Sequence, residues 1–273
     1  MTATGTTMQP ADQPAAQLSD AAFGNDPQRW PLPTARSAYE LWLRAVAAGG
    51  QGRYATAQAD LQTLARHADD PLLSLAHSTR ASFLRQLGWH HLARVADGQA
   101  WALVANRPDA TEARADALVG LAADALGVGR FGVAQRLLDR AAVVTDNGVP
   151  RQQVRLAWVG AELAMVSGRG EDAVEHAERA RGLVGSVGSP RHAVKTDVVY
   201  AAALCSAGRF DDSRRIADGA LRRTQQFGLV PLTWALGCLL GDIGSAEHSR
   251  DEVLQIRDGA AAAVRDRGGR WAG

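Results

Sequence analysis

The sequence lacks the marks of a secreted, membrane-spanning or nucleic-acid-binding protein. Its two cysteines, Cys205 and Cys238, exclude a disulfide scaffold and a metal site built on four cysteines. The first 20 residues have neither the basic nor the apolar region of a secretory signal. The longest apolar stretch, residues 229–241, is too short to span a bilayer. With 30 basic and 29 acidic side chains, and no basic stripe, we expect a cytoplasmic protein with no membrane insertion and no nucleic-acid partner.

Motifs of catalysis and cofactor binding are also missing. The sequence has no G-x-G-x-x-G after a strand, no phosphate loop, no H-E-x-x-H and no C-x-x-C. Two adjacent histidines, His90 and His91, follow a glycine turn, and consecutive helix residues point about 100° apart, which makes a poor metal pair. We therefore predict a protein that is not an enzyme, with no catalytic residues, no cofactor and no metal ligands.

One phrase returns six times along the chain. Its strongest copies read GRYATAQADLQTL, GRFGVAQRLLDRA and GRFDDSRRIADGA. The first glycines of successive copies are separated by 36, 41, 39, 40 and 36 residues, a period typical of a solenoid of helical hairpins. Each glycine is expected to end the first helix of a hairpin in the left-handed backbone conformation. The copies begin at Gly52, Gly88, Gly129, Gly168, Gly208 and Gly244.

The residues after each glycine predict the second helix of the hairpin. An aromatic residue two positions on (Tyr54, Phe131 or Phe210) is expected to fill the corner between the helices. A small residue follows at position five, and apolar residues follow at positions nine and twelve in most copies. These offsets form one helix face on which the backbones can approach closely. Prolines 71, 150, 190 and 231 stand where first helices should begin, since proline is tolerated there.

These offsets resemble those of the tetratricopeptide repeat, in which Gly, Tyr, Ala, an apolar residue and Ala recur in the same order. The repeats here are longer than the usual ~34 residues and look more like the repeats of bacterial MalT-like and peptide-sensing regulators. The resemblance implies an all-α fold: a right-handed superhelical solenoid of about six antiparallel helical hairpins. We predict a flexible arm over residues 1–35, the repeat domain over 36–268 and a tail over 269–273.

The resemblance also implies that first helices line a concave groove, at positions thirteen, ten, six and three before the turn glycine. Three of the seven tryptophans share the position ten before it. Either they anchor a bound peptide in the groove or they fill the core between hairpins. The predicted groove for a partner comprises Tyr39, Trp42, Arg85, Arg155, Trp158, Glu162, Lys195 and Trp234.

Two functions fit this sequence. The first is a protein–protein interaction scaffold or adaptor that binds a peptide or helix of a partner protein in the groove. The alternative is a regulatory sensor that binds a small peptide or ligand and acts through a partner protein, because no DNA-binding module is recognisable. The arm segment 23–33 could occupy the groove or cap the first helix. A homodimer through a terminal hairpin would bury an open apolar end of the solenoid.

Overall fold

The structure is a computed structural model that describes residues 13–146 and 150–272. Within these ranges the chain forms thirteen α-helices, one short 3-10 helix and no strand. No helix of the described part has the length and hydropathy needed to cross a membrane. The elements are α1 (Gln13–Phe23), α2 (Ala38–Gly50), α3 (Tyr54–Leu64), α4 (Asp70–Gln86), α5 (His90–Val104), α6 (Thr111–Gly127), α7 (Phe131–Thr145), α8 (Pro150–Val166), α9 (Gly170–Val184), η1 (Gly185–Val187), α10 (Pro190–Ser206), α11 (Phe210–Gln226), α12 (Val230–Ile243) and α13 (Arg250–Asp266).

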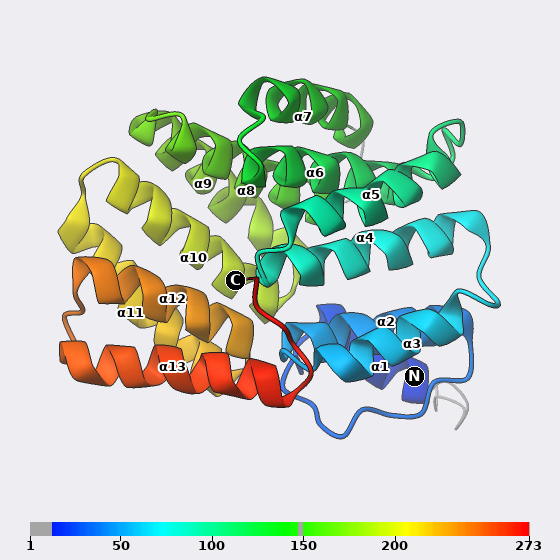
Figure 1. Cartoon of the computed structure of the whole chain (residues 1–273), viewed down its shortest axis with the longest axis horizontal. Helices are drawn as coiled ribbons and strands as arrows, with labels where there is room; N and C mark the ends of the chain where they lie inside the picture. Colours follow the sequence, from blue (N-terminus) through cyan, green and yellow to red (C-terminus); the bar gives the residue numbers. More distant parts are fainter. Residues whose placement is uncertain (1–12, 147–149, 273) are drawn as a thin grey trace, which may run out of the picture.

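Twelve of the helices described form six antiparallel hairpins, from α2/α3 to α12/α13, which confirms the predicted all-α solenoid. The first helices of successive hairpins contact one another and make a continuous inner layer. Each second helix packs outside, between its own first helix and that of the next hairpin (Figure 1). Residues on the inner face of the first helices therefore converge on one space.

The repeat glycines have the predicted backbone conformation. All six have positive φ, from 72° at Gly168 to 88° at Gly88, a region that disfavours a side chain. Five residues after the glycine, the small side chains are fully buried against the partner helix in five copies; they are Ala57, Ala93, Ala134, Ala173 and Ser213. The sixth copy departs from this pattern, because Ser249 caps the N-terminus of α13.

The corner aromatics differ from the prediction in two of three hairpins. Tyr54 is buried, and its hydroxyl donates a hydrogen bond to Gln86 at 3.0 Å. Phe131 and Phe210 are instead 41% and 47% exposed. The difference arises because Gly269 of the C-terminal segment lies against Tyr54, whereas no described residue lies within 4 Å of a Cβ placed on Gly129 or Gly208, the turn glycines of the other two corners.

The two ends of the solenoid meet. The carbonyl of Arg267 accepts a hydrogen bond from the Ala55 amide (3.0 Å), and its guanidinium donates to the Gln51 carbonyl (2.7 Å). Val264 of α13 belongs to the same buried apolar cluster as the first hairpin. We call residues 267–272 the C-terminal latch; it runs from α13 toward the α4/α5 turn (Figure 1). The latch joins the last hairpin to the first two, so the groove of the solenoid is closed on this side.

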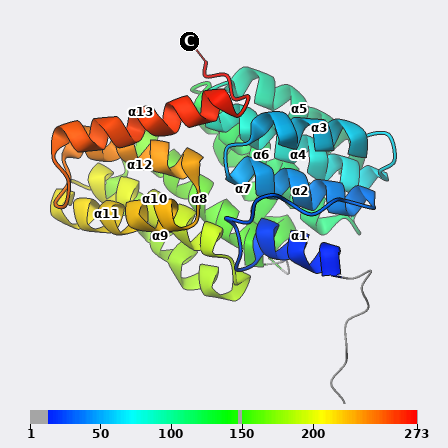
Figure 2. The same cartoon turned by 90° about the horizontal axis from the view of Figure 1, so that it is seen from below.

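The N-terminal segment differs from the expected flexible arm over residues 13–23, which form α1. This helix packs on α2, and Figure 2 shows it beneath that helix at the edge of the molecule. Leu18 is fully buried, and the ring of Phe23 lies 5.4 Å from that of Trp42. The position of α1 corresponds to the capping alternative for the arm, although Phe23 also reaches the inner space. Residues 1–12 of the predicted arm lie outside the described ranges.

Candidate ligand-binding cavity

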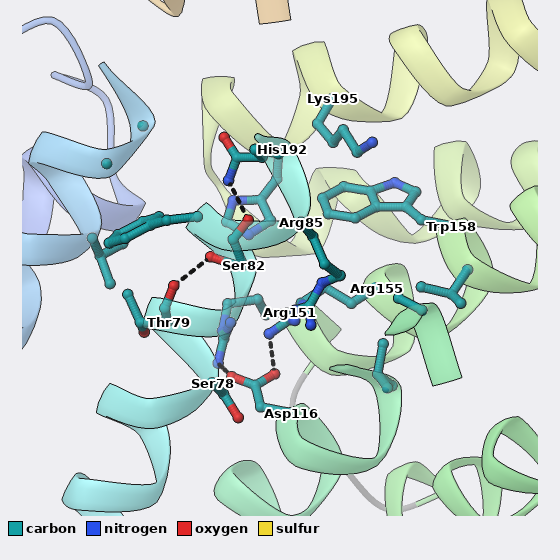
Figure 3. Close-up of a pocket in the computed structure, with 18 of the residues that line it drawn as sticks. Ser78, Thr79, Ser82, Arg85, Asp116, Arg151, Arg155, Trp158, His192 and Lys195 are labelled. Carbon is teal, nitrogen blue, oxygen red and sulfur yellow. Dashed lines mark hydrogen bonds and ion pairs between the residues drawn. The ribbon is translucent and has the colours of Figure 1, made fainter. Parts of the chain in front are cut away.

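A cavity of about 400 Å³ lies at the centre of the solenoid. Its wall is built by the inner faces of α2, α4, α6, α8 and α10, with Phe23 from α1, His90 from α5 and Leu232 from α12 added at its edges. Figure 3 shows the polar and aromatic side chains that converge there. The volume falls within the range of about 300–1,000 Å³ that is common for small-ligand sites.

The structure brings six of the eight predicted groove residues together in the wall of this cavity; they are Trp42, Arg85, Arg155, Trp158, Glu162 and Lys195. The other two lie elsewhere. Tyr39 is 54% exposed, with its ring 5.5 Å from that of Trp42. Trp234 packs against Trp271 of the C-terminal latch, with ring centroids 4.3 Å apart. Closure of the solenoid thus gives Trp234 a partner within the chain.

The two tryptophans of the wall are held between neighbouring hairpins. Trp42 is 3% exposed, and its indole N–H donates to Thr79 of α4 at 3.0 Å. The indole N–H of Trp158 donates to Thr196 of α10 at 3.0 Å, and its ring stacks on His192 at 5.7 Å. Each ring therefore packs between first helices and also contributes to the cavity wall, so the groove and core interpretations both describe part of its surroundings.

Carboxylates inside the wall neutralise most of its basic side chains. Asp116 forms ion pairs with Arg155 and with Arg151 (2.7 Å), and Glu112 also pairs with Arg151 at 2.7 Å. Burial raises the pKa of Asp116, but the two arginines outweigh it and the net pKa is lowered, so this carboxylate stays ionised at neutral pH. Figure 3 shows Asp116 below both guanidinium groups.

A second cluster closes the cavity at α4, α5 and α6. Arg85 lies between Asp97 and Asp124, at 2.9 Å from the latter. Burial raises the pKa of Asp97 to about 7. The positive charge of Arg85 opposes this shift, and the negative charge of Asp124 adds to it. The buried atoms Asp97 Oδ1 and Asp124 Oδ2 have no hydrogen-bond partner within the described ranges. One proton held between these carboxyls makes the cluster neutral.

Among the wall residues that the sequence analysis missed are Arg151, Arg191 and His192. Arg151 and Arg191 stand seventeen residues before Gly168 and Gly208, one helical turn before the first predicted lining position. Adding the position seventeen before the turn glycine to the predicted lining positions would have identified both arginines. His192 follows Arg191; burial, and then the nearby arginines, lower its pKa well below the usual value, so the ring is neutral.

The adjacent histidines have separate surroundings. His90 borders the cavity, and Gly127 leaves room for its ring, since a Cβ there would lie less than 3 Å from its Nδ1. His91 is exposed. In the described part of the chain, no group of three or more His, Cys, Asp or Glu side chains is placed to hold a metal ion.

Comparisons with known proteins identify the fold. No protein-family model matches the chain, and no curated protein matches it. A crystal structure of a Rap protein complexed with competence and sporulation factor has a similar fold, with a TM-score of 0.66 at 10% sequence identity. The similarity covers 85% of this chain and 64% of that one, so this chain spans just under two thirds of the Rap protein. At this identity the likeness shows the fold, which is an all-α helical-repeat solenoid of the tetratricopeptide type.

Proposed function

We propose that the chain is a regulatory scaffold that binds a short peptide in its central cavity and acts through a partner protein. The observation that carries this proposal is the cavity of about 400 Å³, on which five first helices direct aromatic, hydroxyl and charged side chains. Cavities of this size, within the range of about 300–1,000 Å³, commonly hold small ligands. The cavity therefore favours a short ligand, as in the sensor hypothesis.

The wall has the groups that an extended peptide needs. The face of Trp158, stacked on His192, offers a flat aromatic surface that is ordered before binding. The hydroxyls of Ser78, Thr79 and Ser82 line the wall, and Lys195 and Glu162 form an ion pair at 3.3 Å across α8 and α10. Peptide N–H and C=O groups can bond to such side chains, while the aromatic face takes an apolar side chain.

The structural comparison supports the same interpretation. The Rap protein of similar fold was crystallised with a bound factor, so this architecture is compatible with ligand binding. A scaffold of stacked hairpins also offers a physical route from ligand to partner, since each hairpin contacts only its neighbours and a wedge between two of them changes the relative placement of the rest.

The test is affinity selection from a random pentapeptide library on the full chain, followed by tryptophan fluorescence titration of the selected peptides. We expect saturable quenching or a spectral shift that the Trp158→Phe variant loses. The matched control is Trp101→Phe, because Trp101 stacks with Arg140 outside the cavity. If no peptide is selected, or if the signal is lost in the Trp101 variant and kept in the Trp158 variant, the proposed function is wrong.

A further inference from the structure

Arg191 differs from the other cations of the cavity wall because it has no acidic partner. Arg85, Arg151, Arg155 and Lys195 each form at least one ion pair. No Asp or Glu side chain in residues 13–146 or 150–272 lies within ion-pair distance of Arg191. Its Nη2 donates to the Ala22 carbonyl at the end of α1 (2.9 Å), and its buried Nε has no hydrogen-bond partner in the same ranges.

The surroundings of Arg191 add positive charge. The Cζ atoms of Arg151 and Arg191 lie 5.2 Å and 5.6 Å from the centre of the Phe23 ring, so the two guanidinium groups are within about 11 Å of each other. Burial, and then repulsion from Arg151 and Arg155, lower the pKa of Arg191 to about 10, which leaves it charged at neutral pH. His192 next to it is neutral and cannot serve as an anion.

The local balance is one positive charge in excess. The ion pairs offset Arg151 and Arg155 with Glu112 and Asp116, and Lys195 with Glu162, which leaves Arg191 as the cation without a counter-charge among the described residues of this wall. A partly buried guanidinium without a counter-charge is unfavourable, and its buried Nε donor without an acceptor adds to that cost. Both costs are removed by an anion that accepts a hydrogen bond from Nε, since the fork of a guanidinium matches a carboxylate.

We propose that the corner formed by Arg191, Arg155 and Arg151 is a carboxylate-binding subsite, and that the peptide bound in the cavity is acidic at the group that docks there. This inference rests on the proposed function and specifies its ligand. The carboxylate is either the C-terminus of the peptide or the side chain of an aspartate or glutamate, since both present the same two oxygens. Gly50 supports the subsite, because a Cβ there would lie 3.0 Å from Arg191 Cδ and press on the guanidinium stem.

The experiment uses the tightest pentapeptide from the library selection, synthesised in three forms. One has a free C-terminus, one has a C-terminal amide, and one has each Asp or Glu replaced by Asn or Gln. We expect at least one replacement to weaken binding by about tenfold to a hundredfold, as for the loss of one charge-assisted hydrogen bond. The form that loses affinity shows whether the docking carboxylate is the C-terminus or a side chain.

The same peptides are titrated into Arg191→Gln, where the difference in affinity between acidic and neutral forms should disappear. Arg209→Gln serves as an exposed control, in which that difference should persist. Since Arg191 also holds α1, a second variant, Arg155→Gln, is included; it leaves Asp116 paired with Arg151 and should reduce the preference. In the wild type, the Nε–H nuclear magnetic resonance signal of Arg191, assigned by its loss in Arg191→Lys, should move downfield with the acidic form only.

The outcomes separate the two proposals. If a peptide binds in the cavity but its neutral forms bind as tightly as the acidic one, the carboxylate subsite is wrong and the proposed function stands. An unchanged preference in Arg191→Gln, or an unmoved Nε–H signal in the wild type, also overturns the subsite. If no peptide binds at all, the proposed function fails and this inference fails with it.

Discussion

Removal of the Trp271 ring should release the C-terminal latch while leaving the rest of the solenoid folded. This ring packs on Trp234 with centroids 4.3 Å apart, and its N–H donates to the Ala261 carbonyl at 3.3 Å. The latch also forms backbone hydrogen bonds: the Ala55 amide donates to Arg267, and the Ala272 amide donates to Leu87 at 2.8 Å. The Ala55 amide lies in the first turn of α3, where it has no partner inside its own helix.

The expected cost of Trp271→Ala follows from these contacts. Loss of the partly buried ring contributes ~2 kcal/mol, and loss of the aromatic pair contributes ~1 kcal/mol. If the latch opens as a local unit, ~3 kcal/mol raises its open population on the order of 100-fold. The Trp271→Phe variant keeps a ring against Trp234 and loses only the hydrogen bond, so we expect it to cost ~1 kcal/mol.

Hydrogen exchange measures the open population of the latch directly. The amides of Ala55 and Ala272 should exchange on the order of 100-fold faster in Trp271→Ala than in the wild type, with a smaller change in Trp271→Phe. Amides of α6 and α8 should keep their protection, because within the described residues the latch forms no hydrogen bond to these helices. Equal acceleration at all amides would show that the latch is no separate unit, and unchanged protection of Ala55 would show that the tryptophan pair does not hold it; either result refutes the reasoning.

Two further predictions concern the wall of the cavity. Gly127→Ala should destabilise the fold by about 1–3 kcal/mol, because its Cβ would overlap the ring of His90. Gly182→Ala has no described atom within 4 Å of its Cβ and should stabilise the fold by about 0.5–1 kcal/mol. Urea unfolding compares the two variants with the wild type. Burial raises the pKa of Asp97 to about 7, so the folded state binds more protons than the unfolded state between pH 4 and 7. The unfolding free energy should therefore fall as pH rises through this window and level off above it. Asp97→Asn should flatten that fall, and an equally steep slope in this variant would place the titration elsewhere.

The hairpins could be predicted because each repeat carries its own local signals. Gly129 and Gly208 end helices through a backbone conformation that other residues disfavour, and Pro150 and Pro190 begin them. Such signals act within a few residues, so spacing alone placed the first helices and, through the resemblance, most of the wall. Trp42 and Trp158 lie in the cavity wall because their position in the repeat fixes which helix face they occupy.

What the sequence did not indicate depends on contacts between distant segments. Trp234 occupies the same repeat position as Trp158, but its surroundings are set by Trp271, which reaches it only because the solenoid closes. Helix α1 has only two large apolar residues, Leu18 and Phe23, and its burial depends on the face that α2 offers. Arg191 was missed because its role depends on a charge balance among three helices, which no periodicity records.

The proposed carboxylate subsite ties ligand binding to α1. Phe23 of α1 borders the cavity, and α1 is held by the hydrogen bond from Arg191, the same residue to which we assign the ligand carboxylate. A peptide that docks at Nε adds to the contact of Nη2 with Ala22 rather than replacing it, because the two nitrogens are different donors of one guanidinium. Binding should therefore stabilise the packing of α1, and linkage requires that packed α1 tighten peptide binding to the same extent.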